Sequence, residues 1–410
     1  MTFPNDRPYD LVVYGATSFV GKIICAHLAE RLAGSDISWA IAARNPAKLD
    51  EVATSLGLSV DHFIADASDP VALEAMTAST RVLLSTVGPY SLYGSELIAA
   101  VIKTGTDYCD LTGEAHWMQK MIDLHQDDAT LSGSRIVHAC GFDSIPSDMG
   151  VAYTQRIATE LLGEPCRQIA MRVKAMKGGA SGGTIASMMN IMEEAKTNPE
   201  IRRIFANPYA LAPAGLRSGV RQNNVTAPMK DDSSGRWVAP FVMAAVNTRV
   251  VFRSHALMGS PWGEQFMYDE AMIAGDGPAG AAKAGAMAGG MGAFMAASSV
   301  GPLRKVLGDR VLPKPGEGPS PEAQRNGFFD LRFYGSTEPG ATITTRVTGD
   351  RDPGYGSTAK MISEAALMLL DVDPANTPGG FWTPSTAFGQ ALEDRLVEHA
   401  GLTFEIVHSS

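Results

Sequence analysis

The segment "GATSFVG", from Gly15 to Gly21, combines residue types that could bind a phosphate group. It follows the apolar run "YDLVVY" and leads into the helix-like stretch "IICAHLAERLA". Free backbone N–H groups at the start of a helix, together with the helix dipole, favour an anion at such a point. We therefore expect the pyrophosphate of a dinucleotide here, next to Gly15, Thr17, Ser18, Phe19, Val20 and Gly21.

The spacing of the glycines distinguishes between a P-loop and a dinucleotide-binding turn. A P-loop needs G-x-x-x-x-G-K followed by Ser or Thr, whereas here five residues separate the glycines and Ile23 follows Lys22. No hydroxyl is therefore in place to hold magnesium. The dinucleotide pattern G-x-x-G-x-x-G fits better, with Ser18 in place of the middle glycine. A serine hydroxyl can itself donate to a phosphate oxygen.

The end of the second predicted strand indicates which dinucleotide binds. NAD-binding proteins place Asp or Glu there for the ribose 2′-hydroxyl, and NADP-binding proteins place arginine near the 2′-phosphate. This sequence has "AARNPAK", with Arg44 and Lys48 and no carboxylate. Because a guanidinium fork suits a phosphate dianion, we expect NADP(H). An ordinary surface arginine near a helix start is the alternative.

Further strand ends point to the same crevice. Asp66 follows the predicted strand 59–65, where its carboxylate could contact the amino group of an adenine. The segment "STVGPYSLYG" brings four more residues near the nicotinamide ribose, namely Thr86, Val87, Gly88 and Pro89. These residues complete the predicted cofactor site.

Four polar side chains are candidates for the chemistry of a hydride-transfer enzyme. Tyr90 or Tyr93 could donate a proton, although both could equally be packing groups. Asp143 and Ser144, in "CGFDSIPSD", could fix a substrate carbonyl or the nicotinamide amide. They could also be a cap and a first-turn acid, since Pro146 favours the first position of a helix.

These residues need a scaffold of alternating strands and helices. Short apolar runs at 10–15, 38–43, 59–65, 81–87, 106–111 and 135–140 predict strands, and the segments between them have helical spacing. Such alternation predicts an α/β fold with a doubly wound parallel sheet of the Rossmann type over residues 1–150. A second α/β domain with a mixed sheet is expected at 151–375, and residues 376–410 are expected to return and complete the first domain.

Composition excludes several classes of protein. A net charge of −10 and the absence of dense basic patches argue against nucleic-acid binding. The four cysteines lack metal-ligand spacing, so no metal site is predicted. The N-terminal residues do not resemble a secretory signal, and the cytoplasm is the expected location. Residues 284–303 are uncharged and rich in Ala and Gly; we expect a small-residue helix or lid, with a membrane span or peripheral lipid contact as alternatives.

With these residues in place, the chain resembles the saccharopine dehydrogenase-like oxidoreductases, and within them the trans-acting enoyl reductases of mycobacteria. The resemblance covers nearly the whole chain through "YDLVVYGATSFVGK", "STVGPYSLYG", "GTDYCDLTGE", "CGFDSIPSD", "SGGTIASM", "PKPGEGPSPEAQRNGFFDLRFYG" and "GGFWTPSTAFGQAL". It implies a saccharopine-reductase-like second domain and reduction of a double bond in a polyketide-derived lipid precursor. Ser18 departs from the glycine that many relatives carry.

Three functions remain open at this point. The first is NADPH-dependent reduction of an enoyl group on an acyl chain, free or bound to a carrier. The second is an amino-acid oxidoreductase acting on a secondary amine, for which Arg202, Arg203, Arg217 and Arg221 could bind carboxylates. The third is a non-catalytic nucleotide-binding protein at a lipid surface. The oligomeric state is open as well, a homodimer included.

Overall fold

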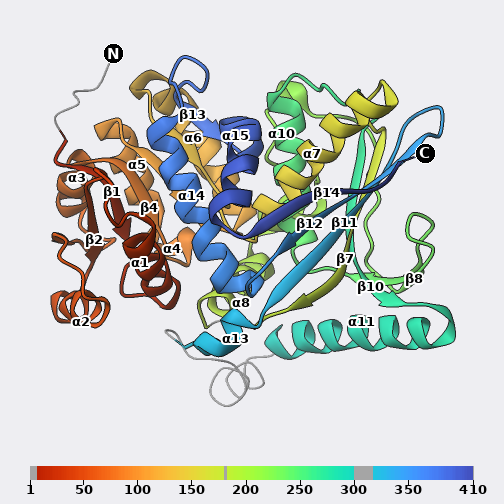
Figure 1. Ribbon diagram of the computed structural model, residues 1–410, viewed down its shortest axis with the longest axis horizontal. Coiled ribbons are helices and arrows are strands. Elements are labelled where there is room, and N and C mark those ends of the chain that lie inside the picture. The colour runs from red at the N-terminus through yellow and green to blue at the C-terminus, as the bar shows by residue number, and fades with distance from the viewer. Residues whose placement is uncertain (1–6, 180–181, 300–316, 410) are drawn as a thin grey trace.

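A computed structural model describes residues 7–179, 182–299 and 317–409. In these residues the strands form two seven-stranded sheets, here called sheet A and sheet B. The two sheets lie side by side with helices between them, and the chain passes from the first to the second and back (Figure 1). One large buried cluster extends from the helices of sheet A to the strands of sheet B.

Sheet A is parallel throughout and has the strand order β13-β6-β5-β4-β1-β2-β3. Its strands are β1 (Tyr9–Tyr14), β2 (Trp39–Ala43), β3 (His62–Ile64), β4 (Thr80–Ser85), β5 (Asp107–Asp110), β6 (Arg135–Val137) and β13 (Gly380–Trp382). The order 3-2-1-4-5-6 is that of a dinucleotide-binding fold. The predicted doubly wound α/β fold is confirmed.

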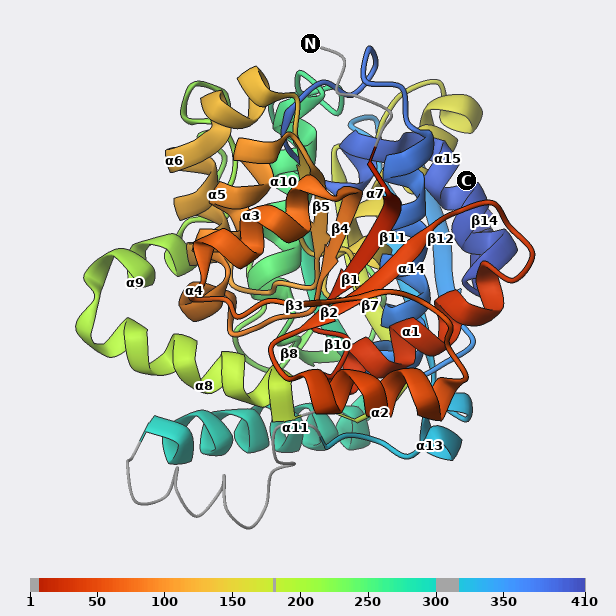
Figure 2. The ribbon, with the colours of Figure 1, turned by 90° about the vertical axis from the view of Figure 1, so that its left-hand side faces the viewer.

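Two helical layers cover sheet A. Its helices are α1 (Phe19–Arg31), α2 (Pro46–Leu56), α3 (Pro70–Ala78), α4 (Tyr90–Tyr93), α5 (Ser95–Thr104) and α6 (Ala115–Ser132). Alternate residues of β1 point to opposite faces: Leu11 and Val13 pack on the α1 side, and Val12 and Tyr14 on the α3–α5–α6 side. Figure 2 shows these layers on either side of the strands.

Sheet B is mixed and has the order β14-β12-β11-β7-β10-β9-β8. Its strands are β7 (Gln168–Lys177), β8 (Met229–Lys230), β9 (Trp237–Pro240), β10 (Met267–Gly275), β11 (Phe328–Ser336), β12 (Thr342–Gly349) and β14 (Leu402–Ser409). Only the β7–β10 pair is parallel among these strands. The predicted second α/β region with a mixed sheet is present.

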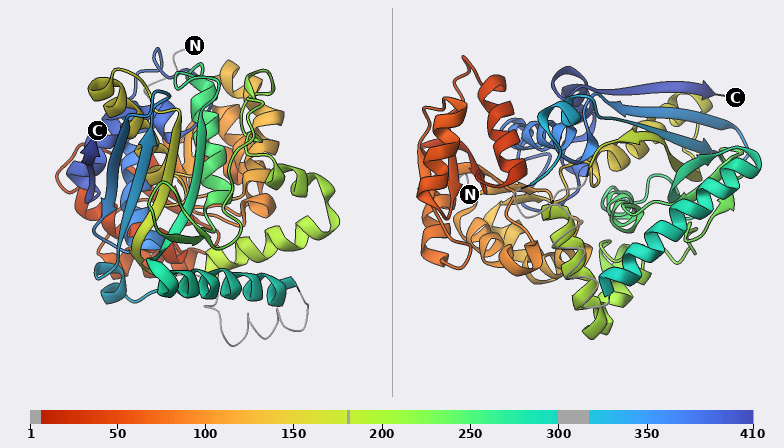
Figure 3. Two further views of the ribbon diagram at one scale, coloured as in Figure 1. Left: turned by 90° about the vertical axis from the view of Figure 1, so that its right-hand side faces the viewer. Right: turned by 90° about the horizontal axis from the view of Figure 1, so that it is seen from below.

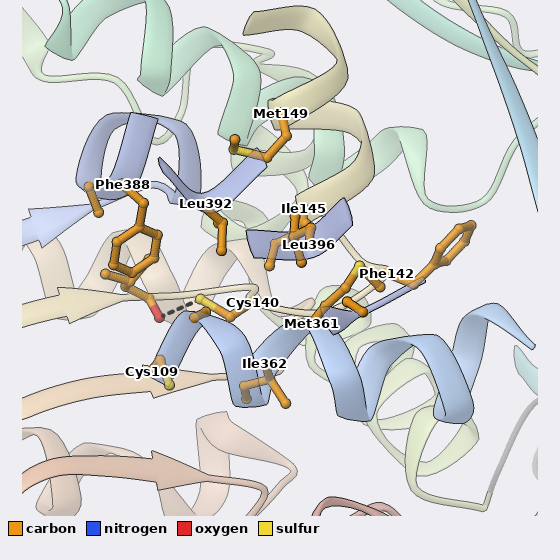
Figure 4. Packing of buried hydrophobic residues seen from close by; sticks show 14 of the residues in the cluster. Cys109, Cys140, Phe142, Ile145, Met149, Met361, Ile362, Phe388, Leu392 and Leu396 are labelled. Carbon is orange, nitrogen blue, oxygen red and sulfur yellow. Dashed lines mark hydrogen bonds between the residues drawn. The ribbon is translucent and has the colours of Figure 1, made fainter. Parts of the chain in front are cut away.

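The remaining helices connect or cover the sheets. They are α7 (Ile145–Leu162), α8 (Gly182–Thr197), α9 (Pro199–Ala206), α10 (Ala244–Leu257), α11 (Gly277–Ser299), α13 (Pro321–Arg325), α14 (Thr358–Asp371) and α15 (Pro384–His399). Buried side chains of α7, α14 and α15, among them Met149, Met361 and Leu392, interlock between the sheets (Figure 4). The Glu364 carboxylate of α14 binds Arg31 at 2.9 Å and Arg395 at 2.7 Å, so charge pairing supports the same junction.

Residues 376–410 divide between the two sheets. The sequence predicts that they complete the first domain, and β13 does pair with β6 of sheet A. However, β14 pairs antiparallel with β12 and therefore belongs to sheet B. In addition α14, expected in the second domain, packs in the cluster on the α1 face of sheet A.

The small-residue segment is a helix along an edge of sheet B. Residues 284–299 belong to α11, which lies against β9 and β10 through Ala284 and Met287 (Figure 3). Positions 300–303 lie outside the described residues. Within the described ranges, none of the helices combines the length and the apolar character that a bilayer crossing needs. Lipid contact through this segment stays a prediction.

Candidate functional site

The turn from β1 to α1 is packed so closely that two positions require glycine. Gly15 has φ of +91°, a conformation that disfavours a side chain, and a Cβ there would collide with Thr86. A Cβ on Gly21 would collide with the carbonyl oxygen of Gly15. The glycine spacing therefore brings the helix N-terminus directly onto the strand end, as in a dinucleotide-binding turn.

Ser18 closes this turn through its side chain. Its hydroxyl accepts the Gly21 N–H at 2.9 Å and so caps α1. The same hydroxyl lies 3.0 Å from that of Thr86, which also bonds the Gly15 carbonyl at 3.0 Å. Hydrogen bonding by Ser18 thus joins the β1–α1 turn to the end of β4. Sequence reasoning expected this hydroxyl at a phosphate and did not identify its capping role.

Two other residues of the predicted phosphate loop face the protein. The Phe19 ring meets the Tyr355 ring edge-on, with centroids 5.1 Å apart. Val20 packs at the border of the large buried cluster, and Thr17 is half-buried in the turn. Phe19 and Val20 consequently hold the loop in place through their side chains.

The partner of Phe19 lies in a turn that sequence reasoning missed. Residues Pro353–Ser357 form a π-helical turn whose N–H groups at Tyr355 and Gly356 donate to the buried Asp352 carboxylate at 3.0 and 2.9 Å. Burial raises the pKa of Asp352. The glycine-rich string "DPGYGS" was the available signal, because closely spaced glycines mark a tight backbone approach.

Arg44 and Asp66 lie exposed near the ends of β2 and β3, and Lys48 lies exposed in the first turn of α2. The Ser68 hydroxyl and N–H hydrogen bonds, and to a smaller extent the Arg44 charge, lower the pKa of Asp66. Arg44 and Asp66 are therefore brought together, as predicted for the adenosine end of a dinucleotide. Arg44 forms no ion pair within 7–179, 182–299 and 317–409. Its guanidinium is thus available for a phosphate, and the site fits NADP(H).

The segment after β4 is fixed by a buried carboxylate. Val87 and Pro89 are half-buried and Gly88 is exposed, in line with a segment that borders a ligand. Glu114, only 1% exposed, accepts the N–H groups of Tyr90 and Ser91 at 2.8 and 2.9 Å. The Glu114 carboxylate thereby caps the N-terminus of α4. Glu114 was quoted in the "GTDYCDLTGE" motif but was not assigned a role.

The two predicted proton donors, Tyr90 and Tyr93, lie in different environments. The buried Tyr90 hydroxyl donates to the Ser85 carbonyl at 3.1 Å and accepts the Leu111 N–H at 3.2 Å. Burial raises the pKa of this phenol well above its usual value. Tyr93 is 45% exposed on the outer side of α4. The geometry favours the alternative reading of Tyr90 as a packing and hydrogen-bonding group.

Asp143 combines a partly exposed side chain with a pKa near neutrality. It is half-buried at the turn between β6 and α7. Burial, and secondarily the Asp110 carboxylate at the end of β5, raise its pKa to about 7. A carboxyl group in this condition exists in both protonation states near neutral pH.

Ser144, its neighbour, belongs to a buried polar network. Its hydroxyl donates to the Asn247 side-chain oxygen at 3.2 Å, and the Asn247 amide donates to Glu270 at 2.9 Å. Glu270 of β10 also accepts the Tyr268 hydroxyl at 2.7 Å, and burial raises its pKa to about 7. Ser144 is thus fixed to sheet B and is fully buried, rather than open to a ligand.

Helix α8 closes over the α4 segment through polar contacts. The Ser187 hydroxyl donates to Glu114 at 3.1 Å, and the Asn190 amide donates to the Ser91 hydroxyl at 3.0 Å. Positions 187 and 190 lie on one face of α8, since residues three apart are helical neighbours. Helix α8, which follows β7 of sheet B, therefore contacts the segment that borders the predicted nicotinamide position.

Two arginines of the amino-acid hypothesis, Arg202 and Arg217, are held by nearby backbone. Arg202 donates to the carbonyl of Ala195 at 2.6 Å, within its own α8–α9 corner. Arg217 donates to the carbonyl of Ala212 at 3.1 Å, within its own loop. Both guanidinium groups are engaged with local backbone, and neither contact involves the crevice residues described above.

Comparison with known proteins identifies a family and close relatives. Residues 11–137 match the family described as "Saccharopine dehydrogenase NADP binding domain". A Mycobacterium tuberculosis protein, provisionally named a trans-acting enoyl reductase, is 40% identical over 406 residues, 95% of this chain and 96% of its own. The "Trans-acting enoyl reductase" of Mycobacterium bovis BCG is 38% identical over 408 residues, 96% of each chain.

A solved structure shows the same overall fold. Apo saccharopine dehydrogenase (L-Glu forming) from Saccharomyces cerevisiae aligns over 98% of this chain and 100% of its own, with a TM-score of 0.53 and 13% identity. That likeness concerns the fold alone. The sequence relatives and the NADP-binding turn establish the class: the chain belongs to the saccharopine dehydrogenase-like NAD(P)-dependent oxidoreductases, in the group of the trans-acting enoyl reductases.

Proposed function

We propose that the protein is an NADPH-dependent enoyl reductase that acts on an α,β-unsaturated acyl group, free or carried as a thioester. NADPH, when bound, supplies the hydride that reduces the β-carbon. The chain must then deliver a proton to the α-carbon and orient the acyl carbonyl. The observation that carries the proposal is the half-buried Asp143, whose pKa is raised to about 7 beside the strand ends of sheet A.

Asp143 fits the role of the proton donor better than either tyrosine. Efficient general acids have a pKa near the working pH, and Asp143 meets this condition. Because its side chain is half-buried, the carboxylate left after proton transfer can be protonated again from solvent. The Tyr90 hydroxyl, in contrast, is bound on both sides by backbone.

The choice of NADPH rests on Arg44. Its exposed guanidinium follows β2, where the adenosine ribose of a dinucleotide binds in this fold. Charge-assisted hydrogen bonds to a phosphate contribute about 1.5–3 kcal/mol each, enough to separate NADPH from NADH. Lys48, four residues further on in the first turn of α2, adds a second exposed positive charge.

A direct comparison of substrates tests the function. NADPH oxidation by the full chain is followed with 2-enoyl-CoA thioesters of short and long chain, and in parallel with 2-oxoglutarate plus lysine. Consumption with an enoyl thioester, with the saturated thioester as product, supports the proposal. Turnover with the amino-acid pair alone identifies an amine oxidoreductase instead and contradicts it.

A further inference from the structure

A small internal cavity lies beside β6, away from the dinucleotide turn. It has a volume of about 10 Å³ and is bounded by His138, Met118, Val250, Arg253 and Phe381, among others. These residues come from α6, α10 and the ends of β6 and β13. A space of this size accommodates one water molecule or one hydroxyl group.

Two buried polar side chains line this cavity, and each has a nitrogen without a hydrogen-bond partner. His138 and Arg253 are 5% and 3% exposed. Neither the His138 Nε2 atom nor the Arg253 Nε atom has a hydrogen-bond partner in the part of the chain that the structure describes. A buried polar atom without a partner is costly, so a bound group that satisfies both nitrogens would be stabilising.

The surroundings fix which nitrogen donates and which accepts. Asp110 accepts the N–H of Thr112 at 3.0 Å and of Ala139 at 3.1 Å through one oxygen, and lies 2.7 Å from His138 Nδ1 through the other. In neutral His138, Nδ1 therefore donates to Asp110, and Nε2 presents a lone pair. Arg253 Nε–H can only donate. The group between them must both accept and donate, which is the pattern of a hydroxyl oxygen.

The cavity shares part of its wall with a larger groove. This groove, of about 580 Å³, lies between α6, the 210–217 loop, the end of α10 and β13. Arg253, Ile122, Leu211, Phe381 and Trp382 line both spaces. The volume falls within the range of small-molecule sites. None of its lining residues belongs to the dinucleotide turn or to the segment after β4.

We propose that the groove and its inner cavity form a second ligand site, which binds an uncharged alcohol with its hydroxyl between Arg253 and His138. The apolar body of the alcohol lies on Leu211, Phe381 and Trp382. The site does not depend on the enoyl reductase proposal, because it uses none of the residues assigned to that reaction.

The rim of the groove disfavours an acidic ligand. Asp123, Asp127 and Asp128 of α6 are exposed along it and face any molecule that enters. Arg217, the exposed cation of the rim, already donates to backbone carbonyls of its own loop. The Arg253 guanidinium donates its terminal groups to the carbonyls of Leu211 and Phe381, which leaves the Nε–H for the ligand. A carboxylate would meet three like charges, whereas an alcohol would not.

The test compares 3-phenylpropan-1-ol with its methyl ether and with 3-phenylpropanoate, by isothermal titration and ligand-observed NMR on the full chain. The ether can accept from Arg253 but cannot donate to His138. We expect the alcohol to bind saturably, about tenfold tighter than the ether, because one buried hydrogen bond contributes about 1–1.5 kcal/mol. The carboxylate should bind more weakly than the alcohol.

Two variants locate the site without touching the polar atoms. Ile122→Trp places a larger side chain at a residue that lines both spaces, and Leu124→Trp obstructs the rim from a position that is 59% exposed and therefore tolerant. Leu131→Trp, on the same helix at 83% exposure and outside the groove, is the control. Loss of alcohol binding in the first two variants and retention in the control support the site.

Three results would overturn the assignment. The first is equal affinity for alcohol and ether, which would mean that the inner cavity holds water only. The second is alcohol binding that survives both groove variants. The third is displacement of the alcohol by NADPH or by an enoyl thioester, which would place it in the dinucleotide crevice.

Discussion

The hydroxyl of Ser18 lies 3.0 Å from the hydroxyl of Thr86, and this contact joins the β1–α1 turn to the end of β4. These two segments border the predicted positions of the pyrophosphate and of the nicotinamide ribose. Because Ser18 also accepts the Gly21 N–H, its replacement should affect stability before it affects cofactor binding.

We expect Ser18→Ala to lower the free energy of unfolding by about 1 kcal/mol, the usual cost of a lost helix cap. The NADPH dissociation constant should change less than about threefold, a difference of under 1 kcal/mol. Urea unfolding and fluorescence titration measure the two effects. Asp69→Ala removes the cap of α3, away from the site, and is the matched control. A more than tenfold weaker affinity at unchanged stability would show that the hydroxyl contacts phosphate.

Arg44→Ala should distinguish the two nicotinamide cofactors. Because Arg44 is exposed and unengaged by a carboxylate in the described ranges, we expect its loss to lower kcat/KM for NADPH by about 10- to 100-fold. The value for NADH should stay nearly constant. Lys22→Ala, an exposed cation in the first turn of α1, is the control. An equal loss with both cofactors would rule out a 2′-phosphate contact.

Asp143→Asn should abolish the fall of the rate on the alkaline side of the pH profile. The raised pKa means that the proton-donating form prevails below about pH 7, so the wild-type kcat should fall as pH rises through that value. The asparagine variant should be slower by about 10²- to 10⁴-fold and insensitive to pH there. Asp148→Asn, in the first turn of α7 at a fully buried position, should keep the wild-type profile. A pH-dependent asparagine variant would exclude Asp143 as donor.

Tyr90→Phe should cost stability rather than chemistry. The change leaves the buried Leu111 N–H and Ser85 carbonyl without their partner, at a cost of about 1–3 kcal/mol. For the folded fraction, kcat should stay within about threefold of wild type. Tyr93→Phe, at an exposed position, should change neither quantity. A loss of rate beyond 100-fold in well-folded Tyr90→Phe would restore the tyrosine as the proton donor.

Glu270→Gln should flatten the dependence of stability on pH. The pKa of Glu270 is about 7 in the folded protein and 4.5 when unperturbed, so the folded state binds more protons between these values. Stability therefore falls as pH rises through this window, by a total on the order of 3 kcal/mol at about 1.4 kcal/mol per unit. Urea unfolding of both proteins at pH 5 and pH 8 measures the difference. If both proteins lose the same free energy of unfolding between pH 5 and pH 8, ionisation of the buried Glu270 is not the cause.

Six of the seven strands of sheet A, all except β13, could be predicted because each lies in a short apolar run between turn-forming residues. β10 could not, since its sequence places Asp269 and Glu270 in the middle of a strand. Tertiary contacts offset these charges: Arg172 binds Asp269 at 2.6 Å, and Asn247 and Tyr268 bind Glu270. Such partners lie far away in sequence, and no local pattern signals them.

The residues of the candidate site also fall into those that could be predicted from the sequence and those that could not. The glycines at 15 and 21 could be identified from sequence because sterics alone require them. The raised pKa of Asp143 could not, because it depends on burial and on Asp110, 33 residues earlier. The role of Glu114 as a cap of α4 was likewise hidden, since the residues that it binds lie on another strand end.

The path of the last thirty residues restricts how this protein can be divided. One strand, β13, extends sheet A, and another, β14, extends sheet B, with α15 between them. A polypeptide cut near residue 150 would leave the N-terminal piece without its seventh strand and without α14. Neither half is therefore a portable module, and fusions or chimaeras of this enzyme should join partners at the chain ends, not between the sheets.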